Sequence, residues 1–250
     1  MSKNVIAFDL DDTLAATKSP ITDRMAELLG ELLKKYQVCV ISGGRFEQFE
    51  KQVIHNVHVE HHYLTNFHMM PTCGTRYYRF DDIAHKWKMI YAEDIPPAER
   101  ERIINALTEA AEKTGYLEKE PHGEIVEDRI SQITFSACGQ EAPPDVKYAW
   151  DPDMKKRLQI REIAVEELSD YEVRIGGTTS IDVTRPGTDK AYGMEKLMHE
   201  LEISKENILF VGDKLEEGGN DYPVKSMGID TIAVDGWEDT ALVIETLIRL

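Results

Sequence analysis

The chain has 250 residues, of which 42% are apolar and 30% are charged, a composition typical of a globular protein. It contains no run of about 18 consecutive apolar residues, so a membrane-spanning helix is not expected. Its formal net charge of −17 argues against binding to nucleic acid or to anionic membranes, because an acidic surface repels both.

The first part of the chain alternates short apolar runs with helical patterns. Residues 5–8 and 38–41 predict buried strands, and residues 22–35 between them predict an amphipathic helix. A second helical segment covers about residues 45–53. Strand, helix, strand, helix is typical of a parallel sheet with helices on its faces.

The middle of the chain mixes strands and helices differently. Strands with alternating polarity, helices and a hairpin are predicted at residues 76–80, 97–113, 130–137, 151–168 and 172–183. The first pattern then resumes at residues 191–201, 208–211, 231–234 and 238–250. We therefore predict a doubly wound α/β core of residues 1–83 and 185–250 with a mainly parallel sheet, and an inserted α+β domain of residues 84–184.

Neither a secretory leader nor a cysteine framework is indicated. The amino terminus lacks the basic head, apolar middle and small-residue cleavage site of a signal peptide, which favours a cytoplasmic location. The three cysteines, Cys39, Cys73 and Cys138, are widely spaced and show no zinc-binding spacing. We expect them to be free thiols.

Acidic residues follow the first predicted strand directly, as Asp9-Leu10-Asp11-Asp12-Thr13. Ligands of open α/β sheets bind beyond the carboxyl ends of the strands, and alternate residues there can place two carboxyl groups at one site. Asp9 is then a candidate nucleophile toward phosphorus, and Asp11 a candidate acid and base for the leaving oxygen and for water. The alternative is a solvated acidic turn.

A second acidic residue, Asp213, follows the predicted strand at residues 208–211. Mg²⁺ prefers hard oxygen ligands, which Asp9, Asp213 and the backbone carbonyl of Asp11 can supply. Taken alone, Gly212-Asp213 is as consistent with a simple turn. Its combination with the first acidic cluster is what predicts a magnesium site.

Five further residues complete the predicted site. Asn220 or Asp221 would orient a metal ligand or a water from outside the first ring of ligands. The hydroxyl of Ser42 and the backbone N–H groups that begin at Gly43 can bind phosphate oxygens at a helix N-terminus. Lys190 can neutralise the phosphate and the Asp9 carboxylate. The alternatives are a helix cap for Ser42 and a solvated surface side chain for Lys190.

The order of these motifs resembles the haloacid dehalogenase superfamily of phosphotransferases over essentially the whole chain. The inserted domain resembles the C2-type cap of the class IIB members. Within that class, the chain is similar to eukaryotic-type phosphomannomutases at residues 176–183, 189–190 and 212–221, and also at residues 45–50.

The resemblance implies a Rossmann-like core and a defined set of roles. It makes Asp9 the nucleophile and Asp11 the acid and base, and it makes Asp9, Asp11 and Asp213 the holders of Mg²⁺. It also implies that Ser180 and Asp182 of the cap contact a sugar.

Several positions depart from the phosphomannomutase pattern. Those enzymes bind the distal phosphate of their substrate with several cap arginines. Here Arg129 occupies one such place, but Gln140 and Lys147 stand where arginine is expected, and lysine does not reproduce arginine's two-pronged grip. Asp12 replaces a glycine, and the loop after Asp221 is shorter.

These departures favour a Mg²⁺-dependent phosphatase of a small phosphorylated metabolite, such as a sugar phosphate, acting through an aspartyl-phosphate. The alternatives are a phosphomannomutase or related hexose-phosphate mutase, and a non-catalytic sugar-phosphate-binding protein with the same fold. We expect neither nucleic acid nor membrane as a partner. The sequence leaves open the identity of the substrate and the oligomeric state, a homodimer included.

Overall fold

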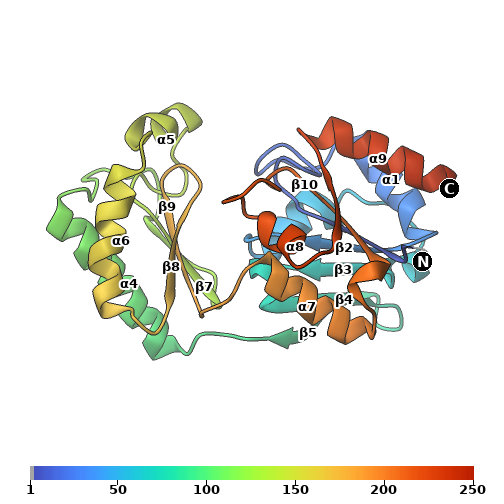
Figure 1. Cartoon of the computed structure of the whole chain (residues 1–250), viewed down its shortest axis with the longest axis horizontal. Helices are drawn as coiled ribbons and strands as arrows, with labels where there is room; N and C mark the ends of the chain where they lie inside the picture. Colours follow the sequence, from blue (N-terminus) through green and yellow to red (C-terminus); the bar gives the residue numbers. More distant parts are fainter. Residues whose placement is uncertain (1–2) are drawn as a thin grey trace. The chain divides into compact units, whose positions relative to one another are not determined.

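The structure, a computed structural model, describes residues 3–250 and consists of two compact units (Figure 1). The core unit comprises the residues up to Ala92 together with Thr188–Leu250, and the inserted unit is Glu93–Gly187. The predicted fold class, an α/β core interrupted by an α+β insertion, is confirmed.

The core unit is built on a seven-stranded sheet with the order β11-β10-β1-β2-β3-β4-β5. Its first five strands in that order are parallel, β4 runs antiparallel to β3, and β5 runs antiparallel to β4. The strands are β1 (Val5–Phe8), β2 (Gln37–Ile41), β3 (Phe67–Met70), β4 (Arg76–Asp81), β5 (Lys86–Ala92), β10 (Ile208–Gly212) and β11 (Asp230–Ala233).

Helices cover both faces of this sheet, which is why every residue of β1 is buried. Ile6 and Phe8 pack on one side against α1 and α9, and Val5 and Ala7 pack on the other side against α7 and α8. Figure 1 shows α1 and α9 side by side on the face opposite α7. The helical segments are α1 (Asp23–Leu33), α2 (Phe46–Phe49), the π-helix η1 (Glu50–Ile54), α3 (His61–Leu64), the 3₁₀ helices η2 (Thr72–Gly74) and η3 (Lys205–Asn207), α7 (Lys190–Leu201), α8 (Tyr222–Ser226) and α9 (Trp237–Arg249).

The inserted unit has its own sheet and its own hydrophobic core. Four antiparallel strands lie in the order β6-β7-β9-β8, and the helices α4 and α6 pack against each other and against this sheet. The elements are α4 (Pro97–Thr114), β6 (Val126–Asp128), β7 (Gln132–Ser136), α5 (Pro144–Trp150), α6 (Lys155–Glu167), β8 (Glu172–Gly176) and β9 (Ser180–Thr184).

The structure corrects the boundaries drawn from the sequence. The predicted insertion at residues 84–184 would include β5, but β5 pairs with β4 along its whole length and belongs to the core sheet. The inserted unit therefore begins at Glu93 and ends at Gly187. Among the described residues, none of the helices combines the length and the apolarity that crossing a membrane requires.

Candidate active site

Asp9 and Asp213 lie at the same edge of the core sheet because they follow two neighbouring parallel strands. Phe8 of β1 is in register with Val211 of β10, and the backbone N–H of Asp9 continues the ladder by donating to the carbonyl of Val211 at 3.0 Å. Asp9 is buried and Asp213 is half-buried. The carboxyl ends of adjacent strands thus bring together two acids that are far apart in the sequence.

Asp221 completes a group of three carboxylates. One oxygen each of Asp9, Asp213 and Asp221 lies within 4.8 Å of the other two. Asp221 is fully buried, and its Oδ2 accepts the backbone N–H of Lys214 at 3.1 Å. The Asp221 carboxylate thus lies within the acidic group, and the orienting role predicted for it from the sequence stays a prediction. The neighbouring Asn220 is exposed.

Lys190 lies between two of these carboxylates. It is the first residue of α7, whose N-terminus is capped by the side chain of Asp189 through a bond from the Tyr192 N–H. Its Nζ is 2.5 Å from Oδ1 of Asp9 and 2.6 Å from Oδ1 of Asp221. With 1% of its side chain exposed, Lys190 is a buried bridging cation and not a solvated lysine.

Burial and charge act in opposite directions on these groups. Burial raises the pKa of Asp9, Lys190 opposes that rise, and the neighbouring charge of Asp221 adds to it. Burial lowers the pKa of Lys190, but the two carboxylates outweigh burial and hold the pKa above its ordinary value. Lys190 therefore stays charged, and its contact favours the ionised form that Asp9 needs in order to act as a nucleophile.

Thr13 is a site residue that the sequence reasoning did not single out. Its buried hydroxyl is 3.4 Å from Oδ2 of Asp9 and 3.5 Å from Oδ1 of Asp213. The hydroxyl therefore lies between the two acids. Its position in Asp9-Leu10-Asp11-Asp12-Thr13, four residues after Asp9 in a turn, was the one available signal.

The three carboxylates fit a divalent cation. They offer hard oxygen ligands, and they carry three negative charges of which Lys190 balances one. Lys214 contributes a second cation at 2.5 Å from Oδ2 of Asp213, but its side chain is half-exposed. A buried excess of negative charge is costly unless a further cation is bound, so the site has the composition that Mg²⁺ requires.

The side chain of Asp11 lies outside the acidic group. Its carboxylate accepts three hydrogen bonds, from the backbone N–H of Lys18 at 2.7 Å and from the side-chain amides of Gln48 at 2.9 Å and Gln52 at 3.1 Å. The two glutamines were not anticipated. The predicted ligation of Mg²⁺ by the backbone carbonyl of Asp11 stays a prediction.

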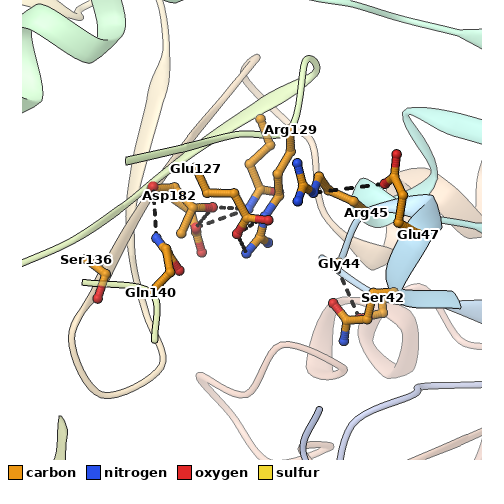
Figure 2. A network of polar contacts seen from close by, with 12 residues as sticks. Ser42, Gly44, Arg45, Glu47, Glu127, Arg129, Ser136, Gln140 and Asp182 are labelled. Atoms are coloured by element: carbon orange, nitrogen blue, oxygen red, sulfur yellow. Dashed lines mark hydrogen bonds and ion pairs between the residues drawn. The ribbon is translucent and has the colours of Figure 1, made fainter. Parts of the chain in front are cut away.

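Ser42 and Gly43 follow β2 and so lie at the edge where Asp9 ends β1. Ser42 is 6% exposed, and its Oγ accepts the N–H of Gly44 at 3.3 Å (Figure 2). The loop is fixed from the other side by Thr72 and Cys73, whose N–H groups donate to the carbonyls of Gly44 and Ser42 at 2.9 Å each. Both residues have positive φ, a strained conformation that tends to mark functional loops.

The remaining predicted residues belong to the inserted unit. Oδ1 of Asp182, in β9, accepts from the side chains of Gln132 at 3.0 Å and Thr134 at 2.6 Å, and Ser180 begins the same strand. Arg129 donates through Nε and Nη2 to Oε2 of Glu127, at 3.1 and 2.7 Å. Figure 2 shows Glu127, Arg129 and Asp182 gathered at one place in this unit.

A parallel α/β core with an acidic cluster and a buried lysine beyond its strand ends is the arrangement of a hydrolase or phosphotransferase. The chain belongs to the haloacid dehalogenase-like hydrolases, whose family model matches residues 6–223. This confirms the family that the sequence motifs indicated.

Comparison with individual proteins points to one part of that family. The chain is 30% identical to phosphomannomutase 2 of Dictyostelium discoideum, over 89% of this chain and 87% of that protein. It is 24% identical to a probable phosphomannomutase of Caenorhabditis elegans, over 99% and 96%. The chain is thus related to phosphomannomutases over nearly its full length.

Solved structures with low sequence identity share the fold. A truncated IMP-nucleotidase of Plasmodium falciparum superposes with a TM-score of 0.71 at 17% identity, covering 100% of this chain and 71% of that one. A trehalose-6-phosphate phosphatase related protein superposes with a TM-score of 0.58 at 12% identity, covering 98% and 97%.

Proposed function

We propose that this chain is a hexose-phosphate mutase of the phosphomannomutase type that works through a phosphorylated Asp9. The observation that carries the proposal is the position of Asp9: buried at a strand end, bonded to Lys190 and grouped with Asp213 and Asp221. The phosphomannomutases related to it over nearly the full length favour the mutase over the phosphatase that the sequence analysis preferred.

In the first step, a carboxylate oxygen of Asp9 attacks the phosphorus of a hexose bisphosphate or monophosphate, and the bond from phosphorus to the sugar oxygen breaks. Asp11 gives its proton to that oxygen. In the second step, the free 6-hydroxyl of a bound hexose 1-phosphate attacks that phosphorus, Asp11 takes the proton of the hydroxyl, the bond from phosphorus to Asp9 breaks, and the bisphosphate is formed again. Asp9, Asp213 and Asp221 would hold Mg²⁺, which supplies positive charge that stabilises a transferring phosphoryl group.

The other residues bind the substrate in this proposal. Lys190 favours the ionised form of Asp9, and Ser42 with the backbone N–H of Gly43 binds oxygens of the transferring group. The inserted unit acts as the cap that selects the substrate. Its residues Ser180 and Asp182 contact the sugar.

A phosphatase is the second candidate, and a specific observation in the inserted unit favours it. A mutase must bind the phosphate that is not being transferred. Arg129 is already paired with Glu127, Gln140 carries no charge, and Lys147 lacks the guanidinium fork. A weak grip on the second phosphate would favour transfer to water.

One experiment separates the candidates. Purified protein is given a hexose 1-phosphate, a catalytic amount of the hexose 1,6-bisphosphate and Mg²⁺, and both the 6-phosphate and inorganic phosphate are measured. A mutase forms the 6-phosphate faster than it releases phosphate, and a phosphatase does the reverse.

Asp9→Asn abolishes both products if Asp9 is the nucleophile. Asp12→Asn, which changes a side chain that bonds Thr17 and not the acidic group, serves as the matched control. Binding of the sugar phosphate without either product would indicate the non-catalytic alternative.

A further inference from the structure

The two oxygens of the Asp11 carboxylate have different surroundings. Oδ1 accepts two hydrogen bonds, from the backbone N–H of Lys18 at 2.7 Å and from Nε2 of Gln52 at 3.1 Å. Oδ2 accepts a hydrogen bond from Nε2 of Gln48 at 2.9 Å. The donors come from segments that lie 7, 41 and 37 residues further along the chain, so the fold assembles them around this side chain.

Gln52 is a buried anchor. The residue is 2% exposed, and Nε2 donates both to Oδ1 of Asp11 at 3.1 Å and to the backbone carbonyl of Ser19 at 2.7 Å. Because both partners are acceptors only, the orientation of the amide is determined: a flipped amide would set Oε1 against a carboxylate. In the orientation found, Oε1 is buried and has no hydrogen-bond partner among residues 3–250, which the structure describes. The fold thus tolerates an unsatisfied acceptor to direct both N–H groups of Gln52.

Gln48 lies where a substrate oxygen could replace it as the partner of Asp11. It is half-buried, and its amide lies against the backbone of Gly44, where a Cβ would come within 2.1 Å of Oε1 of Gln48. It therefore touches both Asp11 and the loop that carries Ser42. Within the described part of the chain, the Gln48 amide donates to Asp11 alone. Gln48 is therefore held less firmly than Gln52, which has two acceptors and is buried.

The local helix accounts for two glutamines reaching one carboxylate. Gln48 lies in α2 and Gln52, four residues later, in the π-helix η1 that continues it. Residues four apart share a helix face. Short π-helical segments often occur at functional sites, and here the segment is fixed by a bond from the N–H of Ile21 to the carbonyl of Gln52 at 2.9 Å.

We propose that Gln52 and Gln48 are positioning residues with separate tasks toward Asp11, an inference that rests on the proposed function. Gln52 and the N–H of Lys18 fix Oδ1 and thereby set the direction of the carboxyl group. Gln48 occupies Oδ2, the working oxygen, until the leaving oxygen of the substrate takes its place. Once Gln48 has left, Oδ2 of Asp11 takes up a proton from water. During transfer the bond from phosphorus to the leaving oxygen breaks, and that oxygen keeps the electron pair and takes this proton.

The test compares two esters that differ in their need for this proton. The anion of p-nitrophenol leaves without help, whereas the anion of phenol is far more basic and needs the proton from Asp11. We expect Gln52→Met to slow the single-turnover release of phenol from phenyl phosphate by about 10- to 100-fold, the range that misplacing a general acid produces. Release of p-nitrophenol from p-nitrophenyl phosphate should change by less than about twofold, because no proton transfer is lost there.

Gln48→Met should have the opposite effect on phenyl phosphate. Freeing Oδ2 removes a hydrogen bond that the substrate has to displace, so phenol release should rise about fivefold, roughly what one exchanged hydrogen bond is worth. Gln159→Met, at an exposed glutamine of the inserted unit, is the matched control and should match the wild-type chain on both esters. Because Gln52 is buried, Gln52→Glu is a second variant that keeps its size, and it should show the same selective loss.

Equal losses on the two esters in both Gln52 variants would overturn the proposal, because they would indicate a purely structural role. A loss of phenol release in Gln48→Met as large as that in Gln52→Met would also overturn it, since the two tasks would then not differ. Failure of the proposed function gives a separate signal: a wild-type chain that cleaves neither ester with Mg²⁺, or that cleaves both after Asp9→Asn.

Discussion

Replacement of Lys190 by methionine tests the electrostatic balance of the site most directly. The change keeps an unbranched side chain but removes the cation between Asp9 and Asp221, to which Nζ makes contacts of 2.5 and 2.6 Å. The side chains of the two acids are 5% and 0% exposed, so water cannot replace the lysine. Two carboxylates then remain buried side by side with no cation.

The magnitude follows from this burial. Removing one partner of a buried ion pair costs about 3–5 kcal/mol, because the other charge is left uncompensated. Without the lysine, burial and the neighbouring charge of Asp221 raise the pKa of Asp9 further above its unfolded value near 4. A carboxyl group whose pKa is higher in the folded than in the unfolded state contributes its full stabilisation below the unfolded pKa. This contribution is lost as pH rises through the folded pKa. The deficit of Lys190→Met should therefore be small at about pH 5 and reach about 3–5 kcal/mol at about pH 8.

The assay is urea unfolding of both proteins with EDTA present, at each pH, with Lys51→Met as a control at an exposed lysine of the core unit. Replacing EDTA by Mg²⁺ should restore part of the lost stability in Lys190→Met, because the three carboxylates regain a cation. The reasoning is refuted if the deficit is the same at both pH values, or if it is below about 1 kcal/mol at the higher one, which is the range of an exposed pair.

Three further predictions concern the nucleophile, the metal and a buried histidine. Asp9→Asn should lower turnover at least about 10³-fold and abolish the incorporation of labelled phosphate into the protein. EDTA should abolish turnover, and Mg²⁺ should restore it better than Ca²⁺, which prefers longer bonds and more ligands; equal rates with the two ions would contradict a preference for Mg²⁺. Burial lowers the pKa of His68 to about 3, so the neutral ring stabilises the fold above its unfolded pKa near 6.5, and this stability is lost as pH falls toward 3. The unfolding midpoint of His68→Gln should depend less on pH across that window, and an unchanged slope would contradict the assignment.

The geometry around His68 supports its neutral state. Nε2 faces Oε1 of Gln37 at 3.0 Å, and Nδ1 faces the hydroxyl of Tyr77 at 2.7 Å. With Gln37 in this orientation, its Oε1 only accepts, so Nε2 carries the hydrogen and Nδ1 accepts from Tyr77. Both ring nitrogens are therefore satisfied without a second proton, and a charged ring would have to be solvated inside the sheet.

The parts of the site that follow strands could be predicted from the sequence. Apolar runs at residues 5–8 and 208–211 indicate buried strands of a parallel sheet, and the ends of such strands lie at one edge. Asp9 and Asp213 are therefore brought together by backbone pairing alone, and that is where the structure places them. Lys190 was found by its place before a core helix, although its complete burial was not foreseen.

The parts that depend on loop closure and on side-chain direction could not be predicted in the same way. The inward position of Asp221 depends on how the loop after Asp213 folds back. The hydrogen bond from the N–H of Lys214 to the Asp221 carboxylate holds the loop in this conformation. Gln48 and Gln52 carry no charge and belong to no catalytic motif, so only their contacts with Asp11 reveal them. The misplaced boundary at residue 84 has a related cause. The strand β5 lies at the edge of the core sheet, and its mixed polar and apolar sequence resembles that of the strands in the inserted unit.

The open question between mutase and phosphatase depends on cations whose state the sequence does not reveal. Every arginine of the inserted unit donates to a carboxylate or a carbonyl of the same unit. Arg157, for example, forms a buried pair with Asp151 and bonds the carbonyl of Gly177, which is a structural task. Arg129 is the arginine that the mutase pattern assigns to a phosphate, and it is bonded to Glu127 on β6. A second phosphate would have to compete with that carboxylate for Arg129. The number of arginines in the inserted unit therefore overstates its affinity for phosphate. In the proposed function, the strength of the Arg129–Glu127 pair would set how often a bound sugar receives the phosphoryl group before water does.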